Sequence, residues 1–143
     1  MLRSKELIMK KRLSFSIIVL TLLTTSVFAG GDEEEQLPSA NSCVDCDLSN
    51  AWLEEADLRK ADFSGAKLYR ANMEYADLRG ANFTGADLSN VRLRGANLSN
   101  AIFDNAILRY TNLGDANLSG ASSKGAKLRD ARFSNIKTDG IRF

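Results

Sequence analysis

Apolar residues recur at every fifth position along most of this chain, with polar residues between them. Each fifth residue from Leu48 to Phe143 is Leu, Phe or Met, except Ser123 and Thr138. The residue two places before it is Ala in 15 of 20 repeats. Because no insertion or deletion breaks this period, it predicts identical structural units stacked in one dimension.

This period fits neither of the regular secondary structures. An amphipathic helix needs apolar residues at spacings that average about 3.6, and a half-buried strand needs alternation at about 2. We therefore expect a chain that turns a corner at every fifth residue, with the large apolar residue and the small residue before it pointing inward. Gly, Asn and Asp suit such corners because they tolerate positive φ or bond to their own backbone. They stand at positions such as Gly65, Gly80 and Asn90.

A second period, of 20 residues, indicates that four such sides close one coil. Positions 20 apart should then stack on one another and share a character. The column that begins at Leu48 contains only leucine. The column that holds the phenylalanines reads Phe63, Phe83, Phe103, Ser123 and Phe143. Since aromatic rings pack well when stacked, this column predicts a phenylalanine stack in the core.

The phrases ADLRG, ANFTG, ADLSN and ANLSN resemble the tandem A(D/N)LXX units of the pentapeptide-repeat family, and the resemblance runs from Cys46 to Phe143. It implies the family's fold, which is all-β: a right-handed quadrilateral parallel β-helix with four five-residue sides to a coil. About five coils over residues 41–143, each rising by ~4.8 Å, would form a rod on the order of 25 Å long. The interior would be a filled core and not a channel.

The N-terminal residues predict export. Residues 1–29 begin with five basic residues and continue as an apolar run from Leu13 to Phe28. Val27 and Ala29 then match the −3 and −1 positions of a signal-peptidase site. We expect cleavage of this signal peptide, which would place the mature protein in the periplasm or outside the cell with no membrane span. A retained membrane anchor is the alternative.

Two further features of this region affect the mature chain. Either Met1 or Met9 is the true start, because Met9 is followed at once by a short basic region. Residues 30–40 contain Asp32 and three glutamates, and they predict an acidic flexible linker.

The only two cysteines, Cys43 and Cys46, both fall on inward positions at the start of the repeats. One interpretation is a pair of small buried residues. The other is a disulfide at the first coil, because an exported domain meets an oxidising compartment and the end of a solenoid exposes unpaired backbone. A redox motif or a zinc site is not expected, since there is no second cysteine pair and no histidine.

The sequence predicts no catalytic, cofactor-binding or metal-binding residues. The absence of histidine removes the commonest general base and metal ligand. Asp57 and Asp77 are one coil apart, roughly the separation of the two carboxylates in a retaining glycosidase. Because Asn97 and Asn117 continue the same column, we interpret the pair as part of a periodic polar ladder.

Charge bears on the choice of partner. Some cytoplasmic members of the resembled family are strongly acidic rods that mimic DNA and bind a type II topoisomerase. From residue 41 onward this chain carries 14 basic and 13 acidic residues, so we keep that role as the alternative and an envelope enzyme as the second alternative. Nucleic-acid binding would need a basic stripe with interleaved aromatic residues and is not expected. The first prediction is an exported, non-enzymatic structural or protein-interaction module.

A cluster of outward apolar, aromatic and basic residues predicts a contact with a protein partner. Ile102 and Ile107 occupy outward positions that usually hold Asp or Asn. Tyr110 is expected beside them, with Tyr69 and Arg70 one coil below. The predicted patch consists of Tyr69, Arg70, Ile102, Ile107, Arg109 and Tyr110.

The C-terminal coil predicts a second contact surface. The last residue, Phe143, falls on an inward position, and Ile136 and Ile141 replace the usual Ala. Two such ends could stack head to head in a homodimer, as related proteins often do through their C-terminal ends, or the last residues could fray. Ser123 interrupts the phenylalanine column, either as a tolerated substitution or as a local gap.

Charge is also uneven along the predicted rod. Residues 41–105 hold 7 basic and 10 acidic residues, whereas residues 106–143 hold 7 basic and 3 acidic ones. This gradient is either a solvated surface, or it orients end-to-end association or favours an anionic surface at the C-terminal end.

Overall fold

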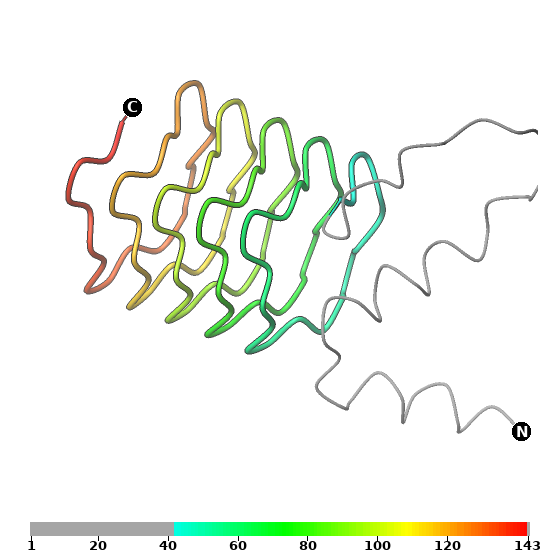
Figure 1. The fold of residues 1–143 in the computed structure, drawn as a ribbon, viewed down its shortest axis with the longest axis horizontal. Coiled ribbons are helices and arrows are strands. Elements are labelled where there is room, and N and C mark those ends of the chain that lie inside the picture. Colours follow the sequence, from blue (N-terminus) through cyan, green and yellow to red (C-terminus); the bar gives the residue numbers. More distant parts are fainter. Residues whose placement is uncertain (1–41, 143) are drawn as a thin grey trace, which may run out of the picture.

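The repeats stack as a rod of similar coils that follow one another in chain order (Figure 1). The computed structural model describes residues 42–142, so the predicted signal peptide at 1–29, the predicted linker at 30–40 and Phe143 lie outside the described residues. Between residues 42 and 142 there is no helix and no strand longer than a single bridge. The fold is therefore a repeat solenoid built from isolated parallel bridges.

Each bridge is parallel and joins two residues 20 positions apart, from Ser42–Asp62 to Ser122–Arg142. One coil thus takes 20 residues, as the phenylalanine column predicts. Two main-chain hydrogen bonds flank each bridge; around Lys67, for example, Leu48 N donates to the Lys67 carbonyl at 2.7 Å and Lys67 N donates to the Cys46 carbonyl at 2.8 Å. The coil closes on the coil below it, which satisfies most of the backbone polar groups.

Four sides make up each coil, and we name them by their outward residues. Face 1 contains Asp47 and every twentieth residue after it, and face 2 contains Trp52 and its successors. Face 3 follows from Asp57, and face 4 from Asp62.

A residue with positive φ stands at every corner, at each fifth position from Asp45 to Gly140. A hydrogen bond across the corner closes the turn, as from Ala51 N to the Leu48 carbonyl at 3.0 Å. The Asp or Asn that precedes each central apolar residue supports the same turn. Its side-chain oxygen accepts the main-chain N–H two residues on, as Asp47 does from Ser49 at 2.9 Å. Asp and Asn alternate at this position because both carry that acceptor.

The core is a continuous column of inward side chains. Phe63, Phe83 and Phe103 stack with ring centroids 5.2 Å apart, and their planes differ by 13° at the first step and 5° at the second. The alanines two places before each central residue are almost all fully buried. Their small size lets the backbone approach the axis, while Leu, Met and Phe fill the centre.

The interior loosens at the last described coil. Leu118, on the coil below, is 4% exposed, whereas Phe133, an inward residue of the last coil, is 43% exposed. Ser123 stands where a further phenylalanine would continue the stack, and its hydroxyl donates to the Arg142 carbonyl at 3.3 Å. The missing ring leaves a gap, which is the second of the two interpretations of Ser123.

No helix in residues 42–142 is long and apolar enough to cross a membrane.

Candidate functional site

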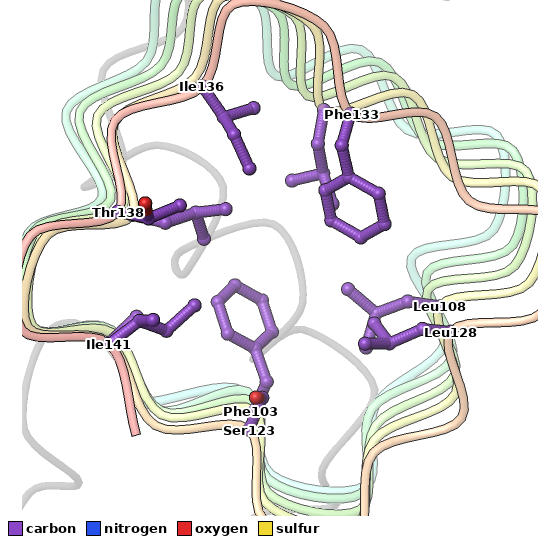
Figure 2. A pocket seen from close by; sticks show the side chains of 11 residues that line it. Phe103, Leu108, Ser123, Leu128, Phe133, Ile136, Thr138 and Ile141 are labelled. Atoms are coloured by element: carbon purple, nitrogen blue, oxygen red, sulfur yellow. The ribbon is translucent and has the colours of Figure 1, made fainter. Parts of the chain in front are cut away.

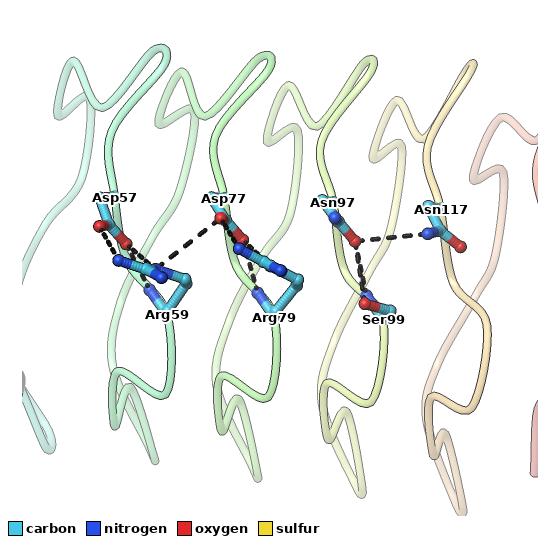
Figure 3. Close-up of polar contacts among 7 residues, drawn as sticks. All are labelled: Asp57, Arg59, Asp77, Arg79, Asn97, Ser99 and Asn117. Atoms are coloured by element: carbon cyan, nitrogen blue, oxygen red, sulfur yellow. Dashed lines mark hydrogen bonds and ion pairs between the residues drawn. The ribbon is translucent and has the colours of Figure 1, made fainter.

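Face 3 carries the polar ladder that the sequence predicts (Figure 3). Arg59 donates to both carboxylate oxygens of Asp57, at 2.7 and 2.6 Å, and Arg79 does the same to Asp77 at 2.8 and 2.7 Å. Arg59 also lies 3.8 Å from Asp77 on the next coil. Further along the rod, Asn amides continue the column.

These contacts leave both carboxylates of the ladder ionised. The hydrogen bond from Arg59 lowers the pKa of Asp57, and the hydrogen bond from Arg79 lowers the pKa of Asp77. A glycosidase needs one of its two carboxyl groups to hold a proton near neutral pH. The pair is therefore unsuited to that chemistry, and the interpretation as a structural ladder stands.

The corner between faces 1 and 2 is different, because its side chains leave a shallow furrow along the rod. Two hollows, of about 630 and 470 Å³, lie side by side there and share Asn90 and Arg92. We call this the corner furrow. It is lined by Asn50, Trp52, Arg70, Asn72, Asn90, Arg92, Tyr110, Asn112, Asp130 and Arg132, with small residues of face 2 as its floor.

Exposed rings and arginines dominate the corner furrow. Trp52 and Tyr110 are each 56% exposed. The guanidinium of Arg70 lies over the ring of Tyr69, 5.0 Å from its centroid. No ion pair between described residues includes Arg70, Arg92 or Arg132. These cations are thus available to a ligand, unlike those of the face 3 ladder.

The structure corrects the geometry of the predicted patch. Arg70 and Tyr110 are two coils apart and not one, because each coil takes 20 residues. Ile102 lies on face 4, a full face away from the corner furrow, and Ile107 is half-buried on face 1. The four remaining residues of the patch, Tyr69, Arg70, Arg109 and Tyr110, lie along the corner.

Sequence reasoning missed Arg92 and Arg132 as members of this site. Both lie in the outward column of face 2 that begins with Trp52. Reading that column at intervals of 20, as was done for the phenylalanines, would have placed the three side chains on one line. Grouping residues by their nearness in sequence joined Ile102 to the patch instead.

At the N-terminal end, Cys43 and Cys46 form a disulfide with Cα atoms 5.4 Å apart. Cys43 packs against the start of the core. Within residues 42–142, His, Cys, Asp and Glu side chains form no group of three that could hold a metal ion.

A second hollow opens inside the last described coil (Figure 2). This end cavity has a volume of about 220 Å³. Phe103, Leu108, Leu113 and Leu118 lie on the coil below it. The last coil contributes Ser123, Leu128, Phe133, Ile136, Thr138 and Ile141. The cavity exists because two inward positions that hold Phe and Leu elsewhere hold Ser123 and Thr138 here.

Four cations surround this end of the rod, one on each face. They are the outward residues of the last described coil: Lys127, Arg132, Lys137 and Arg142. All four are exposed, and no ion pair between described residues includes any of them. On the coil below, the same columns hold Ile107, Asn112, Asn117 and Ser122. The basic C-terminal half noted in the sequence is thus in part an ordered ring.

Comparison with solved structures places this fold among known solenoids. A pentapeptide repeat protein from Nostoc Pcc 7120 is 24% identical, with 87% of this chain and 99% of that one covered, at a TM-score of 0.60. One from the cyanobacterium Cyanothece 51142 is 25% identical, covers 73% of this chain and 92% of that one, and gives a TM-score of 0.46. One from the thylakoid lumen of Arabidopsis thaliana is 32% identical, covers 68% and 64%, and gives 0.34.

No curated protein matches the chain significantly. The family model described as pentapeptide repeats matches in 8 copies, over residues 46–85, 86–122 and 103–135. Those matches span the same residues that form the coils, the corners and the stacked core. The chain therefore belongs to the pentapeptide repeat family.

Proposed function

We propose that this protein is an exported, non-enzymatic interaction module that contacts a protein partner through its corner furrow. The observation that carries the proposal is the contrast between two sides of one rod. On face 3 the arginines are engaged by carboxylates of their own repeats. Along the corner furrow, Arg70, Arg92 and Arg132 form no such pairs, and the rings of Trp52 and Tyr110 are more than half exposed.

Side chains of these types are the ones that dominate protein interfaces. Trp, Tyr and Arg are enriched among residues that contribute most to binding, because they combine a large apolar area with a directional polar group. In the corner furrow they are spread over several coils, which gives a partner a long line of contact.

The solenoid supports this role because it holds the contacts in place before binding. Each outward residue of the corner furrow is attached to a backbone bridge, as Arg92 is to Asn72 and Asn112. A surface that is already ordered loses less conformational entropy when a partner binds.

Export rests on the leader at residues 1–29 and is supported by the disulfide. A bond between Cys43 and Cys46 suits an oxidising compartment and would be rare in the cytosol. Fractionation of cells, with mass spectrometry of the mature N-terminus, tests this part. We expect a chain that begins at Gly30 in the exported fraction; a chain that keeps the leader in the cytosol contradicts it.

The contact is tested by site-specific photo-crosslinking in intact cells. A photoreactive phenylalanine analogue at Tyr110 should give one dominant protein adduct. The same analogue at Arg79, equally placed on the rod but on face 3, is the matched control and should give none. Adducts of equal strength at both positions, or no adduct at Tyr110, contradict the proposal.

A further inference from the structure

The end cavity is an apolar chamber whose shape follows from the core below it. The ring of Phe103 is the last member of the stack, and Ser123 offers only a hydroxyl at the next step (Figure 2). All other side chains at the cavity are apolar except Thr138. The Ser123 hydroxyl is already used by the Arg142 carbonyl. Such a chamber offers few polar partners to water, and apolar cavities of about 150 Å³ stay dry and accept apolar guests.

The ring of Lys127, Arg132, Lys137 and Arg142 surrounds the same end of the rod. These side chains come from all four faces, whereas no other coil carries a cation on more than one face. Four like charges around one apolar opening repel each other unless a counter-charge is near. The ring therefore favours an anionic group at the rim of the cavity.

We propose that this end of the protein binds a free anionic amphiphile of the fatty-acid class. Its apolar chain enters the end cavity beside Phe103, and its carboxylate lies at the cation ring. Arginine and lysine side chains bind carboxylates through charge-assisted hydrogen bonds. The cavity alone would accept any apolar guest, and the ring alone would accept any anion. Together they select a molecule that has both parts. The corner furrow has no part in this inference.

A second copy of the chain suits this end less well than an amphiphile does. Head-to-head stacking would cover the apolar cavity, but it would also bring two rings of four cations face to face. Like charges that meet across an interface oppose association. An amphiphile covers the same apolar surface and brings the missing negative charge.

The test compares three ligands that share a twelve-carbon chain and differ in their head group. Dodecanoate, dodecyltrimethylammonium and dodecyl maltoside are titrated into the mature protein by calorimetry, each below its micelle concentration and at low salt. We expect dodecanoate to bind at least about tenfold more tightly than the cationic ligand. Equal affinity for all three, or no binding of dodecanoate, overturns the proposal.

Two variants separate the cavity from the ring. Ser123→Phe fills the chamber and should abolish binding of dodecanoate, while circular dichroism checks that the solenoid is intact. Lys127→Gln with Lys137→Gln keeps the chamber and should remove the preference for the anionic head group. Arg59→Gln on face 3 is the matched control for lost charge and should bind like the parent protein. Unchanged binding by the Ser123 variant contradicts the chamber as the site.

Two other occupants of this end are outcomes of the same experiment. Light scattering on the ligand-free protein at micromolar concentration should show a monomer, and a dimer that dodecanoate does not dissociate would assign the surface to a second copy. Vesicles that contain anionic phospholipid provide the last arm. Binding to vesicles without binding to free dodecanoate would assign the cation ring to a membrane surface and overturn the proposal.

Discussion

The ring of Phe83 stacks on the ring of Phe103 with centroids 5.2 Å apart and planes 5° from parallel. The two residues are 20 positions apart in the chain, so the stack repeats the spacing of one coil. Both rings are almost fully buried. The contact joins successive coils through the core in the same direction as the backbone bridges join them at the surface.

Loss of a ring from the middle of this stack should be costly. Phe83→Ala leaves a cavity between Phe63 and Phe103, and such truncations cost about 3–5 kcal/mol of unfolding free energy. The matched control is Phe133→Ala, because Phe133 is also an inward residue but is 43% exposed. The control should cost only about 1 kcal/mol. Urea denaturation measures both, and equal losses would contradict the described core.

Addition of a ring at the gap should have the opposite effect. Ser123→Phe continues the stack above Phe103 and fills part of the end cavity, which has a volume of about 220 Å³. We expect a gain of about 1–2 kcal/mol and a higher melting temperature. Ser134→Phe, an exposed position on the same coil, is the control and should give no gain. A lowered melting temperature for Ser123→Phe would mean that the chamber cannot hold a ring.

Two glycines with the same backbone conformation should respond differently to a methyl group. Gly85 and Gly95 both stand at corners, with φ of +68° and +66°. A Cβ atom on Gly85 meets nothing within 4 Å, whereas one on Gly95 would lie 2.5 Å from two ring carbons of Tyr75.

Alanine at either glycine costs about 1 kcal/mol for the left-handed conformation. Gly95→Ala should cost more, because the ring of Tyr75 must also move. Thermal unfolding of the two variants measures the difference. In a Tyr75→Ala background the two alanine variants should become equal, and a difference that persists there would contradict the role of the ring.

Acid should weaken the ladder on face 3. The hydrogen bonds from Arg59 and Arg79 lower the pKa of Asp57 and Asp77 from the ordinary value of 3.8. A lowered pKa in the folded state means that the ion pairs contribute stability above pH 3.8, and that this contribution is lost as the pH falls through the lower folded-state values. Since both pairs lie at the surface, solvent screening limits each to about 1 kcal/mol or less.

The double variant Arg59→Gln with Arg79→Gln provides the comparison. Its unfolding free energy should fall less steeply than that of the parent protein as the pH drops below 3.8. High salt should reduce the difference between the two proteins. Parallel pH profiles at low salt would show that the ladder contributes no stability.

The spacing of residues predicted the parts of the fold that depend on repetition. The period of five predicted the corners, and every one of them has a residue with positive φ. The period of 20 predicted the coil, and the stacking of Phe63, Phe83 and Phe103 confirms it. These features follow from the sequence because each repeat contacts its neighbours in the same way, so one rule applies at every step.

The sites were harder to predict because they break that rule. The error in placing Tyr69 and Arg70 one coil below Tyr110 came from judging nearness by eye along the chain. The members of the corner furrow lie 20 or 40 residues apart, as Trp52, Arg92 and Arg132 do. The predicted disulfide alternative concerned two residues three positions apart, and there the sequence alone narrowed the choice to two.

The sequence by itself determined the corner at each fifth residue, the 20-residue coil and the identity of the inward side chains. These are local choices, made by the volume of Ala, Leu and Phe and by the tolerance of Gly, Asn and Asp for a turn. Only the tertiary structure decided which outward side chains meet and where the core leaves space. Stacking of the coils brings cations from four faces to one end, and the volume lost at Ser123 and Thr138 becomes a cavity only because the neighbouring coil holds its own side chains in place.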